Sequence, residues 1–292
     1  MRLGDEDPSG NFIDRTGRGG MGFGGGGGGN MLGCLLPLVA SRFGMVGVLV
    51  LLLGYCALTT LGGGGGLLGG GGGGTSQTAP SGQSTLEPNT RELLTRVLGS
   101  TERRWSEIFA RSGTQYKPTT MVAYSNSDQS GCGAAQAAMG PFYCPTDQRI
   151  YIDPQFFSEL SQRFGAPGDF AMAYVIAHEV GHHVQNLEGT LDRVQQAQGR
   201  ASQTEGNQIQ VGVELQADCY AGVWAANDKN LMEPGDLEEG MRAAEAIGDD
   251  TLQKQMQGRV VPESFTHGSA AQRQAALRKG LETGDPAACK FN

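Results

Sequence analysis

The apolar residues between positions 169 and 187 recur at the spacing of a buried helix. They are Phe170, Met172, Ala173, Val175, Ile176, Ala177, Val180, Val184 and Leu187. Because apolar residues cover most of such a helix, the pattern predicts a helix inside the core, and Gly189 supplies a stop after it. Similar patterns predict helices at residues 90–111, 154–164 and 270–281 and short strands at residues 119–124 and 149–153.

The helix predicted at residues 169–187 carries the sequence His178-Glu179-Val180-Gly181-His182. Because a helix repeats every 3.6 residues, His178 and His182 point the same way and can both bind one zinc ion. Glu179 can then reach a metal-bound water and take its proton, which is the arrangement of metallopeptidases. The motif therefore predicts metal-assisted hydrolysis of a peptide bond. A core helix with two merely hydrogen-bonded histidines is the alternative, since five residues are a moderate signal.

A second helical pattern, at residues 213–224, carries Glu214 and Asp218 on one face, four residues apart. A catalytic zinc site commonly takes two histidines and one carboxylate and leaves the fourth position to water. Glu214 is the predicted carboxylate ligand, and Asp218 is predicted to accept the remaining N–H of a ligating imidazole, that of His178. A solvated acidic face is the alternative, because most helical carboxylates are surface groups, but this helix is otherwise apolar.

His267 is the candidate for the remaining part of the chemistry, the stabilisation of a tetrahedral oxyanion. It stands just before the helix at residues 270–281, for which Ser269 is the predicted cap. Arg273, one turn into that helix, is predicted to support His267 or to bind the substrate backbone. An exposed loop histidine and a surface arginine are the alternative.

Two other polar features receive no metal-binding role. His183 is displaced about 100° around the helix from His182, so it cannot share the ligand face and is expected behind the ligands or at the surface. Residues 228–250 are rich in carboxylates and are predicted to be a solvated helix face, not a second metal site.

These elements together predict an α+β, zincin-like domain at residues 90–292. It is expected to be mainly helical, with a small strand layer packed on the helix of His178 and His182 and with the Glu214 helix alongside. Roughly two hundred residues are enough for one such domain. The strand at residues 149–153 is expected to border the substrate cleft, where an extended peptide could add to its edge.

The chain resembles the bacterial putative neutral zinc metallopeptidase family well beyond the HExxH motif. The resemblance lies in Met1-Arg2, Ser9, Asn11, Asp14-Arg15, Trp105, Phe109, Gly113, Tyr116, Pro118, Cys132-Gly133, Gly140 to Pro145, Ile150 to Asp153, Phe156-Phe157, Arg163 to Ala166, Asp169-Phe170 and His178 to Gln185. Members often carry a tryptophan at the third position, where this chain has Leu3. The ExxAD and THxS…R elements also resemble membrane-integrated gluzincin peptidases. That resemblance implies Glu214 as third ligand and His267 as transition-state stabiliser.

The N-terminal part of the chain is too glycine-rich to bury a core. The chain has 292 residues and 48 glycines, and residues 19–29 and 62–74 are almost pure glycine, as is typical of flexible connectors. We therefore predict a disordered segment at residues 1–30 and a linker at residues 62–89. The formal net charge of −8 excludes the basic surface that nucleic-acid binding requires.

Between the connectors, residues 31–61 are predicted to be a membrane anchor. Its core, residues 43–61, has no charged side chain and as a helix would extend about 28 Å, close to the thickness of the hydrocarbon layer. Arg42 and the arginines before it favour a cytoplasmic N-terminus, which would place the catalytic domain outside a bacterial inner membrane. A cleaved signal peptide and a lipid anchor at Cys56 are the alternatives.

Four cysteines in the predicted domain, Cys132, Cys144, Cys219 and Cys289, indicate an oxidising compartment. They permit three pairings, among which the sequence cannot choose. The closeness of Cys132 to Cys144 favours that pair and leaves Cys219 with Cys289. Four free thiols in a cytoplasmic enzyme are the alternative.

The prediction is thus a membrane-anchored zinc endopeptidase that binds one Zn²⁺ and acts on a protein or peptide substrate. No nucleic-acid partner is expected. The oligomeric state stays open. Two other classes remain: a zinc hydrolase of a non-protein amide, such as one in the cell wall, and a tethered, non-catalytic zinc-binding protein. Glu179 argues against the latter, because a structural zinc needs no base and usually has four protein ligands.

Overall fold

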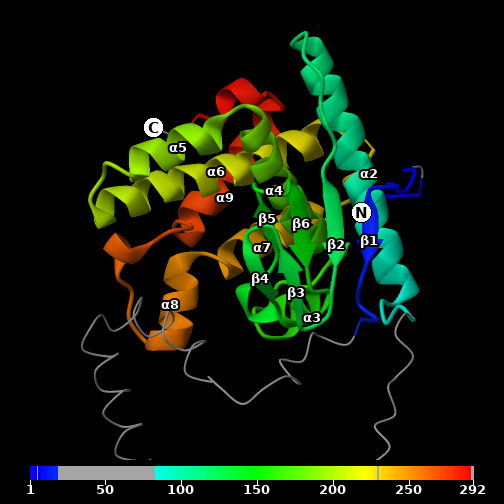
Figure 1. Ribbon diagram of the computed structural model, residues 1–292, viewed down its shortest axis with the longest axis horizontal. Coiled ribbons are helices and arrows are strands. Elements are labelled where there is room, and N and C mark those ends of the chain that lie inside the picture. Colours follow the sequence, from blue (N-terminus) through cyan, green and yellow to red (C-terminus); the bar gives the residue numbers. More distant parts are fainter. Residues whose placement is uncertain (5, 19–82, 229, 291–292) are drawn as a thin grey trace, which may run out of the picture. The chain divides into compact units, whose positions relative to one another are not determined.

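The computed structural model describes residues 1–4, 6–18, 83–228 and 230–290, which belong to one folded unit. The predicted anchor at residues 31–61 and most of its two connectors lie outside these residues. Within the described ranges, the structure contains no helix with the length and apolar character needed to cross a bilayer. The unit is mainly helical with a small sheet, which confirms the predicted α+β class (Figure 1).

The described elements follow one another in a strand-rich first half and a helical second half. In chain order they are β1 Phe12–Asp14, α2 Pro88–Arg111, β2 Thr120–Ala123, β3 Ser127–Ser130, β4 Gly133–Gln136, β5 Phe142–Cys144, β6 Arg149–Ile152, α3 Gln155–Gln162, α4 Asp169–Leu187, α5 Thr190–Gln198, α6 Gln203–Asn227, α7 Asp236–Ala246, α8 Asp249–Gln257 and α9 Ala270–Thr283. Short 3₁₀ turns occur at Ala137–Met139, Pro262–Ser264 and Pro286–Ala288.

Helix α4 lies at the centre of the core, in contact with α2, α6 and α7. Its side chains are almost all buried, which explains why its apolar pattern covers most of the helix surface. Helices α6 and α9 pack closely against each other, because each carries a glycine where the other helix's backbone passes. A Cβ at Gly280 would overlap the carbonyl oxygen of Cys219, and a Cβ at Gly222 would overlap that of Leu277.

The sheet has the strand order β1-β2-β6-β5, and β3 and β4 form a separate hairpin. Strands β1, β2 and β6 are parallel, whereas β5 pairs with β6 in antiparallel orientation. The expectation that a peptide adds to the strand at residues 149–153 is therefore wrong: β6 has neighbours on both sides, and β1 and β5 are the edge strands. Sequence patterns do not show strand order, because backbone pairing leaves no local signature in the side chains.

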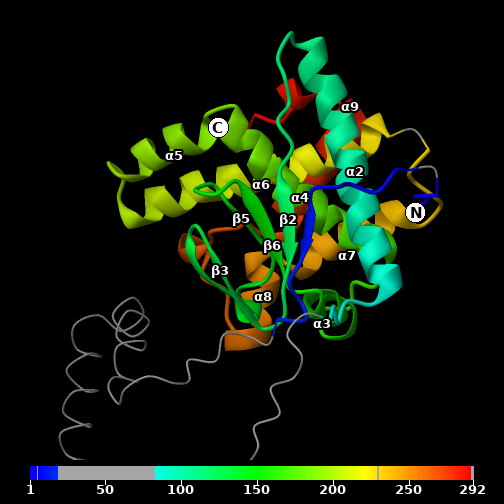
Figure 2. The same ribbon diagram turned by 45° about the vertical axis from the view of Figure 1, so that its right-hand side comes forward.

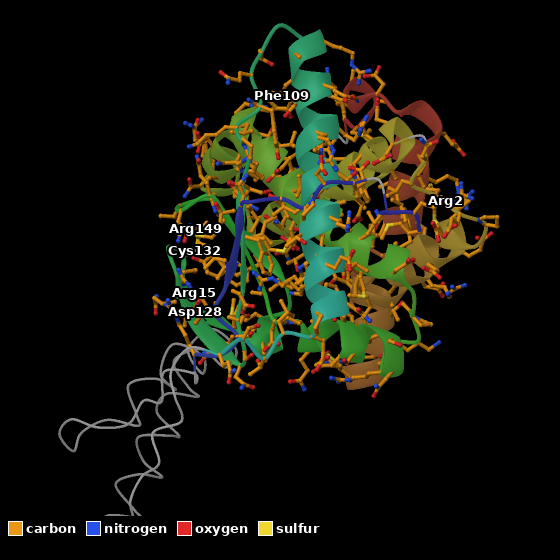
Figure 3. All side chains as sticks on the ribbon, turned by 90° about the vertical axis from the view of Figure 1, so that its right-hand side faces the viewer. Arg2, Arg15, Phe109, Asp128, Cys132 and Arg149 are labelled. Atoms are coloured by element: carbon orange, nitrogen blue, oxygen red, sulfur yellow. A yellow bond between two sulfur atoms is a disulfide. The ribbon has the colours of Figure 1, made fainter. Side chains whose placement is uncertain are left out.

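The N-terminal residues are folded onto this unit, which corrects the predicted disorder of residues 1–30 over the part that the structure describes. Strand β1 pairs with β2, and Arg2 and Arg15 lie on opposite sides of α2, which the segment crosses (Figures 2 and 3). Thr16 then meets Thr85 through two hydrogen bonds of 3.1 and 3.2 Å. The chain on either side of residues 19–82 therefore comes together at one place.

Residues 228–250 are only partly the solvated face that their charge predicted. Three of their carboxylates are buried, those of Asp228, Asp236 and Asp249. The α-amine of Met1 lies 3.4 Å from Asp236 and 3.1 Å from Glu233, and Asp249 binds the loop before α9. Burial is tolerated because each of these carboxylates has a hydrogen-bond or charged partner.

Both disulfides have the pairing that sequence proximity favoured. Cys132 is bonded to Cys144, which joins the β3–β4 hairpin to β5, and Cys219 is bonded to Cys289, which joins α6 to the C-terminal tail. Cys144, Cys219 and Cys289 are buried.

Candidate metal centre

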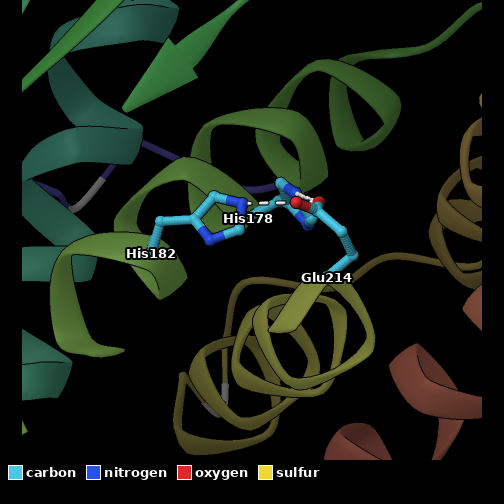
Figure 4. Close-up of side chains that lie close together, drawn as sticks. All are labelled: His178, His182 and Glu214. Carbon is cyan, nitrogen blue, oxygen red and sulfur yellow. Dashed lines mark hydrogen bonds and ion pairs between the residues drawn. The ribbon is translucent and has the colours of Figure 1, made fainter. Parts of the chain in front are cut away.

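His178 and His182 of α4 and Glu214 of α6 converge on one point (Figure 4). The Nε2 atoms of His178 and His182 lie 3.2 and 3.5 Å from Oε2 of Glu214. Two ligand atoms about 2.1 Å from a tetrahedral zinc ion are about 3.4 Å apart, so the observed spacing fits zinc. A set of two imidazoles and one carboxylate is also the donor chemistry of catalytic zinc sites, which leave a fourth position open.

Gly181 allows the two helices to approach closely enough for this convergence. A Cβ at position 181 would lie 2.9 Å from the carbonyl oxygen and 3.0 Å from the Cα of Ala217 in α6. These contacts are too short, so any larger side chain would push α6 away from α4. Glu214 would move with α6, away from the two histidines. The glycine inside the motif is therefore required by the close packing of α4 against α6.

Each histidine donates its Nδ1 hydrogen away from the metal position. Nδ1 of His178 lies 2.8 Å from Oδ1 of Asp218, and Nδ1 of His182 lies 2.8 Å from Oε1 of Gln185. The orientation of the Gln185 amide follows from its Nε2, which donates to the carbonyl oxygen of Val213 at 2.8 Å. In both rings the Nε2 lone pair is thereby directed to the shared point, as metal binding requires.

Glu214 also has a partner, Gln210, whose Nε2 donates to Oε1 at 2.9 Å. Its other oxygen stays directed at the histidines. Sequence reasoning missed both Gln185 and Gln210. Helical spacing could have found them, because Gln185 follows His182 by three residues and Gln210 precedes Glu214 by four.

Asp218 lies at the centre of a buried polar cluster. Arg273 donates to both of its carboxylate oxygens at 2.8 Å, and the Tyr174 hydroxyl donates to Oδ1 at 2.6 Å. Although burial opposes its charge, Arg273 and then His178 lower the pKa of Asp218 to about 2. Burial likewise opposes the positive charge of His178. Asp218, through its negative charge and its hydrogen bond, nevertheless raises the pKa of the metal-free imidazole to about 10.

The position of Arg273 corrects its predicted role. The residue is 2% exposed, and its guanidinium is occupied by Asp218, with a further contact to the carbonyl oxygen of Ile247 at 3.3 Å. It is therefore placed to orient Asp218, and through it His178, rather than to bind the substrate backbone. The sequence could not distinguish these roles, because Asp218 and Arg273 are 55 residues apart.

His267 lies in the loop before α9, with its side chain half exposed. Asp249 holds this loop: its Oδ2 accepts the backbone N–H groups of Thr266 and His267 at 2.7 Å, and its Oδ1 lies 3.2 Å from Nδ1 of His267. The hydrogen bond to Asp249 is the main cause that raises the pKa of His267, against the effect of burial. Asp249 had been assigned to a solvated face, so its role was missed.

His183 is buried and makes no contribution to the metal position. Its ring nitrogens lie 2.7 Å from the carbonyl oxygen of Lys117 and 3.0 Å from the Tyr143 hydroxyl. Asn186 donates to the same hydroxyl at 3.0 Å. Burial lowers the pKa of His183, so the ring is neutral. Its position away from the ligand face agrees with the prediction, and its contacts join α4 to the edge strand β5.

A cleft of about 790 Å³ opens over the three converging side chains. Glu179 and His267 line it together with His178, His182, Glu214 and Arg273, so the cleft gathers all the residues assigned to catalysis or metal binding. Its other walls come from β5 with its flanking residues and from α3, α5 and α8; they include Met139, Phe142, Tyr143, Phe156, Leu191, Gln195 and Leu252.

The chain also matches a known protein family. The family described as "Putative neutral zinc metallopeptidase" matches residues 1–291. The chain belongs to this family. Among its relatives, "Uncharacterized protein YpfJ" of Escherichia coli is 44% identical over 244 residues, 83% of each chain. "Uncharacterized protein Rv2575" of Mycobacterium tuberculosis is 47% identical over 188 residues, 60% of this chain and 62% of the relative. No solved structure matches significantly.

Proposed function

We propose that this family member is a zinc-dependent endopeptidase with a zincin-like catalytic domain. The observation that carries the proposal is the convergence of His178, His182 and Glu214, each with its other polar atom held by a hydrogen-bond partner, at a cleft. Zinc bound there would polarise a scissile carbonyl and lower the pKa of a bound water. A structural site would not need the open fourth position or a cleft above it.

Glu179 is the proposed general base. It follows His178 in α4 and lines the cleft, so it is placed to take a proton from the attacking water and return it to the leaving amine. His267, which lines the same cleft, is the proposed donor to the oxyanion that develops on the carbonyl oxygen. The mechanism requires no covalent acyl-enzyme.

The substrate is proposed to bind as an extended peptide along β5. This strand pairs with β6 on one side, and Phe142 and Tyr143 line the cleft. Main-chain hydrogen bonds to an edge strand bind peptides of many sequences, while the neighbouring side chains select among them. The apolar side chains of Met139, Phe142 and Phe156 favour an apolar residue in the substrate.

The test uses the zinc-loaded full-length protein and a peptide library, with new termini identified by mass spectrometry. Termini that appear with the wild type, but not with Glu179→Gln or after chelation, support the endopeptidase. If purified peptidoglycan is cleaved and the peptides are not, the site is that of a cell-wall amide hydrolase. If zinc is bound and neither substrate is cleaved, the protein is a zinc-binding protein and the proposal fails.

Asp249→Asn is expected to shift the alkaline side of the pH–rate profile to lower pH. His267 is the proposed oxyanion donor in its protonated form, and Asp249 raises its pKa above the ordinary value of 6.5. Activity should therefore fall as pH rises through the raised pKa, and the neutral amide should bring this fall to lower pH. The measurement is kcat/KM against pH for the wild type, Asp249→Asn and His267→Ala. An unchanged profile would remove His267 from the mechanism.

The proposed location is the oxidising side of the bacterial inner membrane, because the domain has two disulfides and structural disulfides are rare in the cytosol. The docked N-terminal segment restricts how residues 43–61 could anchor the protein. A single crossing with a cytoplasmic N-terminus would put β1 and β2 on opposite sides of the membrane, yet the two strands are paired. In place of the predicted single-pass topology, we therefore propose that the described residues before and after positions 19–82 lie on the same side of the membrane.

Thiol labelling tests this location in spheroplasts, with Cys34 and Cys56 changed to serine. Cysteines placed at Arg2 and Met256, whose side chains are exposed, should both react with a membrane-impermeant maleimide. Labelling at position 256 alone would overturn the same-side arrangement. Labelling of both only after lysis would place the domain in the cytoplasm.

A further inference from the structure

A continuous line of hydrogen bonds joins His182 to the Cys219–Cys289 disulfide. Oε1 of Gln185 lies 2.8 Å from Nδ1 of His182, and Nε2 of Gln185 donates to Oε1 of Gln216 at 2.9 Å. Nε2 of Gln216 then donates to the carbonyl oxygen of Cys289 at 3.0 Å. Cys289 is bonded to Cys219. We call Gln185, Gln216 and Cys289 the relay. The side-chain amides of both glutamines accept a hydrogen bond on the histidine side and donate one on the disulfide side.

The surroundings of the relay leave little freedom to its members. Gln185 is fully buried, and Cys219 and Cys289 are also fully buried. Gln185 makes a second bond to the Val213 carbonyl, next to the ligand Glu214. An amide in such a site must keep its partners, because water cannot replace them. The orientation of His182 therefore depends on the two acceptors that hold the Gln185 amide, the Val213 carbonyl and Oε1 of Gln216.

The disulfide determines the position of the last member of the relay. Cys289 follows the 3₁₀ turn Pro286–Ala288, near the end of the described chain. Its bond to Cys219 holds this tail on α6, directly after Asp218, the residue that orients His178. Without the bond, only noncovalent contacts would hold the segment of Cys289 on α6, and the position of the Cys289 carbonyl would be less constrained.

We propose that the Cys219–Cys289 disulfide positions His182 for metal binding through Gln216 and Gln185, so that zinc is held at full affinity only after this disulfide has formed. The inference rests on the proposed zinc site. Formation of the bond is a thiol–disulfide exchange: the two thiols lose two protons and two electrons, and a disulfide oxidant of the cell envelope is reduced to two thiols. The oxidising compartment would thereby complete the metal site.

The experiment measures zinc affinity of the full-length protein by competition with a chelator of known affinity, without any peptide substrate. Gln185→Leu and Gln216→Leu interrupt the relay, and Cys219→Ala/Cys289→Ala removes the disulfide. Loss of a partner that orients a ligand typically lowers metal affinity about 10- to 100-fold. We expect a loss in this range for Gln185→Leu and about tenfold for the other two. Cys132→Ala/Cys144→Ala, which removes the disulfide outside the relay, should keep wild-type affinity.

Combining Gln216→Leu with Cys219→Ala/Cys289→Ala separates positioning from general stabilisation. If the disulfide acts through Gln216, the combined variant should lose no more affinity than either parent. Losses that multiply, or wild-type affinity in Gln216→Leu, would overturn the proposal. Circular dichroism and thermal unfolding show whether each variant is folded. If the wild type itself binds no zinc, the proposed function fails. If the wild type binds zinc and the relay variants bind it with the same affinity, the relay proposal fails and the proposed function stands.

Discussion

Glu179→Gln is expected to keep the fold and the bound zinc while losing about a hundred- to ten-thousandfold in turnover, the contribution typical of positioned proton transfer. Glutamine has nearly the same shape as glutamate, so the packing of α4 is retained. It cannot take a proton from water. Since Glu179 is not among the three converging ligand side chains, the loss should appear in kcat and not in metal content.

The measurement compares zinc content by elemental analysis with the rate of cleavage of a peptide identified from the library. Glu238→Gln serves as the control. Glu238 is an exposed glutamate of α7, so the substitution makes the same chemical change away from the cleft. If Glu179→Gln cleaves the peptide as fast as the wild type, the proposed mechanism is wrong even when zinc is bound.

Glu214→Ala is expected to release zinc from a protein that still folds. Loss of a residue that only orients a ligand costs about 10- to 100-fold in metal affinity, and loss of a direct ligand should cost more. The substitution also removes the negative charge that faces the two imidazoles. This charge raises the pKa of His182 against the effect of burial, so the pKa of His182 should fall in the variant.

Zinc stoichiometry after dialysis decides this prediction, with Glu238→Ala as the matched control. Circular dichroism must show that the variant is folded, since an unfolded chain would lose zinc for another reason. Undiminished stoichiometric zinc in folded Glu214→Ala would remove this residue from the ligand set and leave the third ligand to be found elsewhere in the cleft.

Local patterns predicted the elements that carry the site. Helix α4 has the predicted ends, Asp169 and Leu187, because its apolar residues and the following Gly189 are all signals within a few residues. The start of α9 was also predicted: Ser269 forms a capping box with Gln272. Within one helix, spacing alone placed His178 and His182 on the same face.

Short strands and long-range partners could not be predicted in this way. Strand β1 has three residues, too few for a periodic pattern, and its partner β2 lies more than a hundred residues further along the chain. Asp249 looked like one of many surface carboxylates until the loop of His267 was seen to close around it.

By itself, the sequence determined the chemistry that is available: two imidazoles and a base on one helix, and a carboxylate pair on another. These follow from helical periodicity, which acts over a few residues and is written in the local pattern. Only the tertiary structure decided what Arg273, Asp249 and His183 do, and which strands form the edges of the sheet. Such roles depend on helices and strands that meet across long stretches of chain, where packing, and not spacing, brings the partners together.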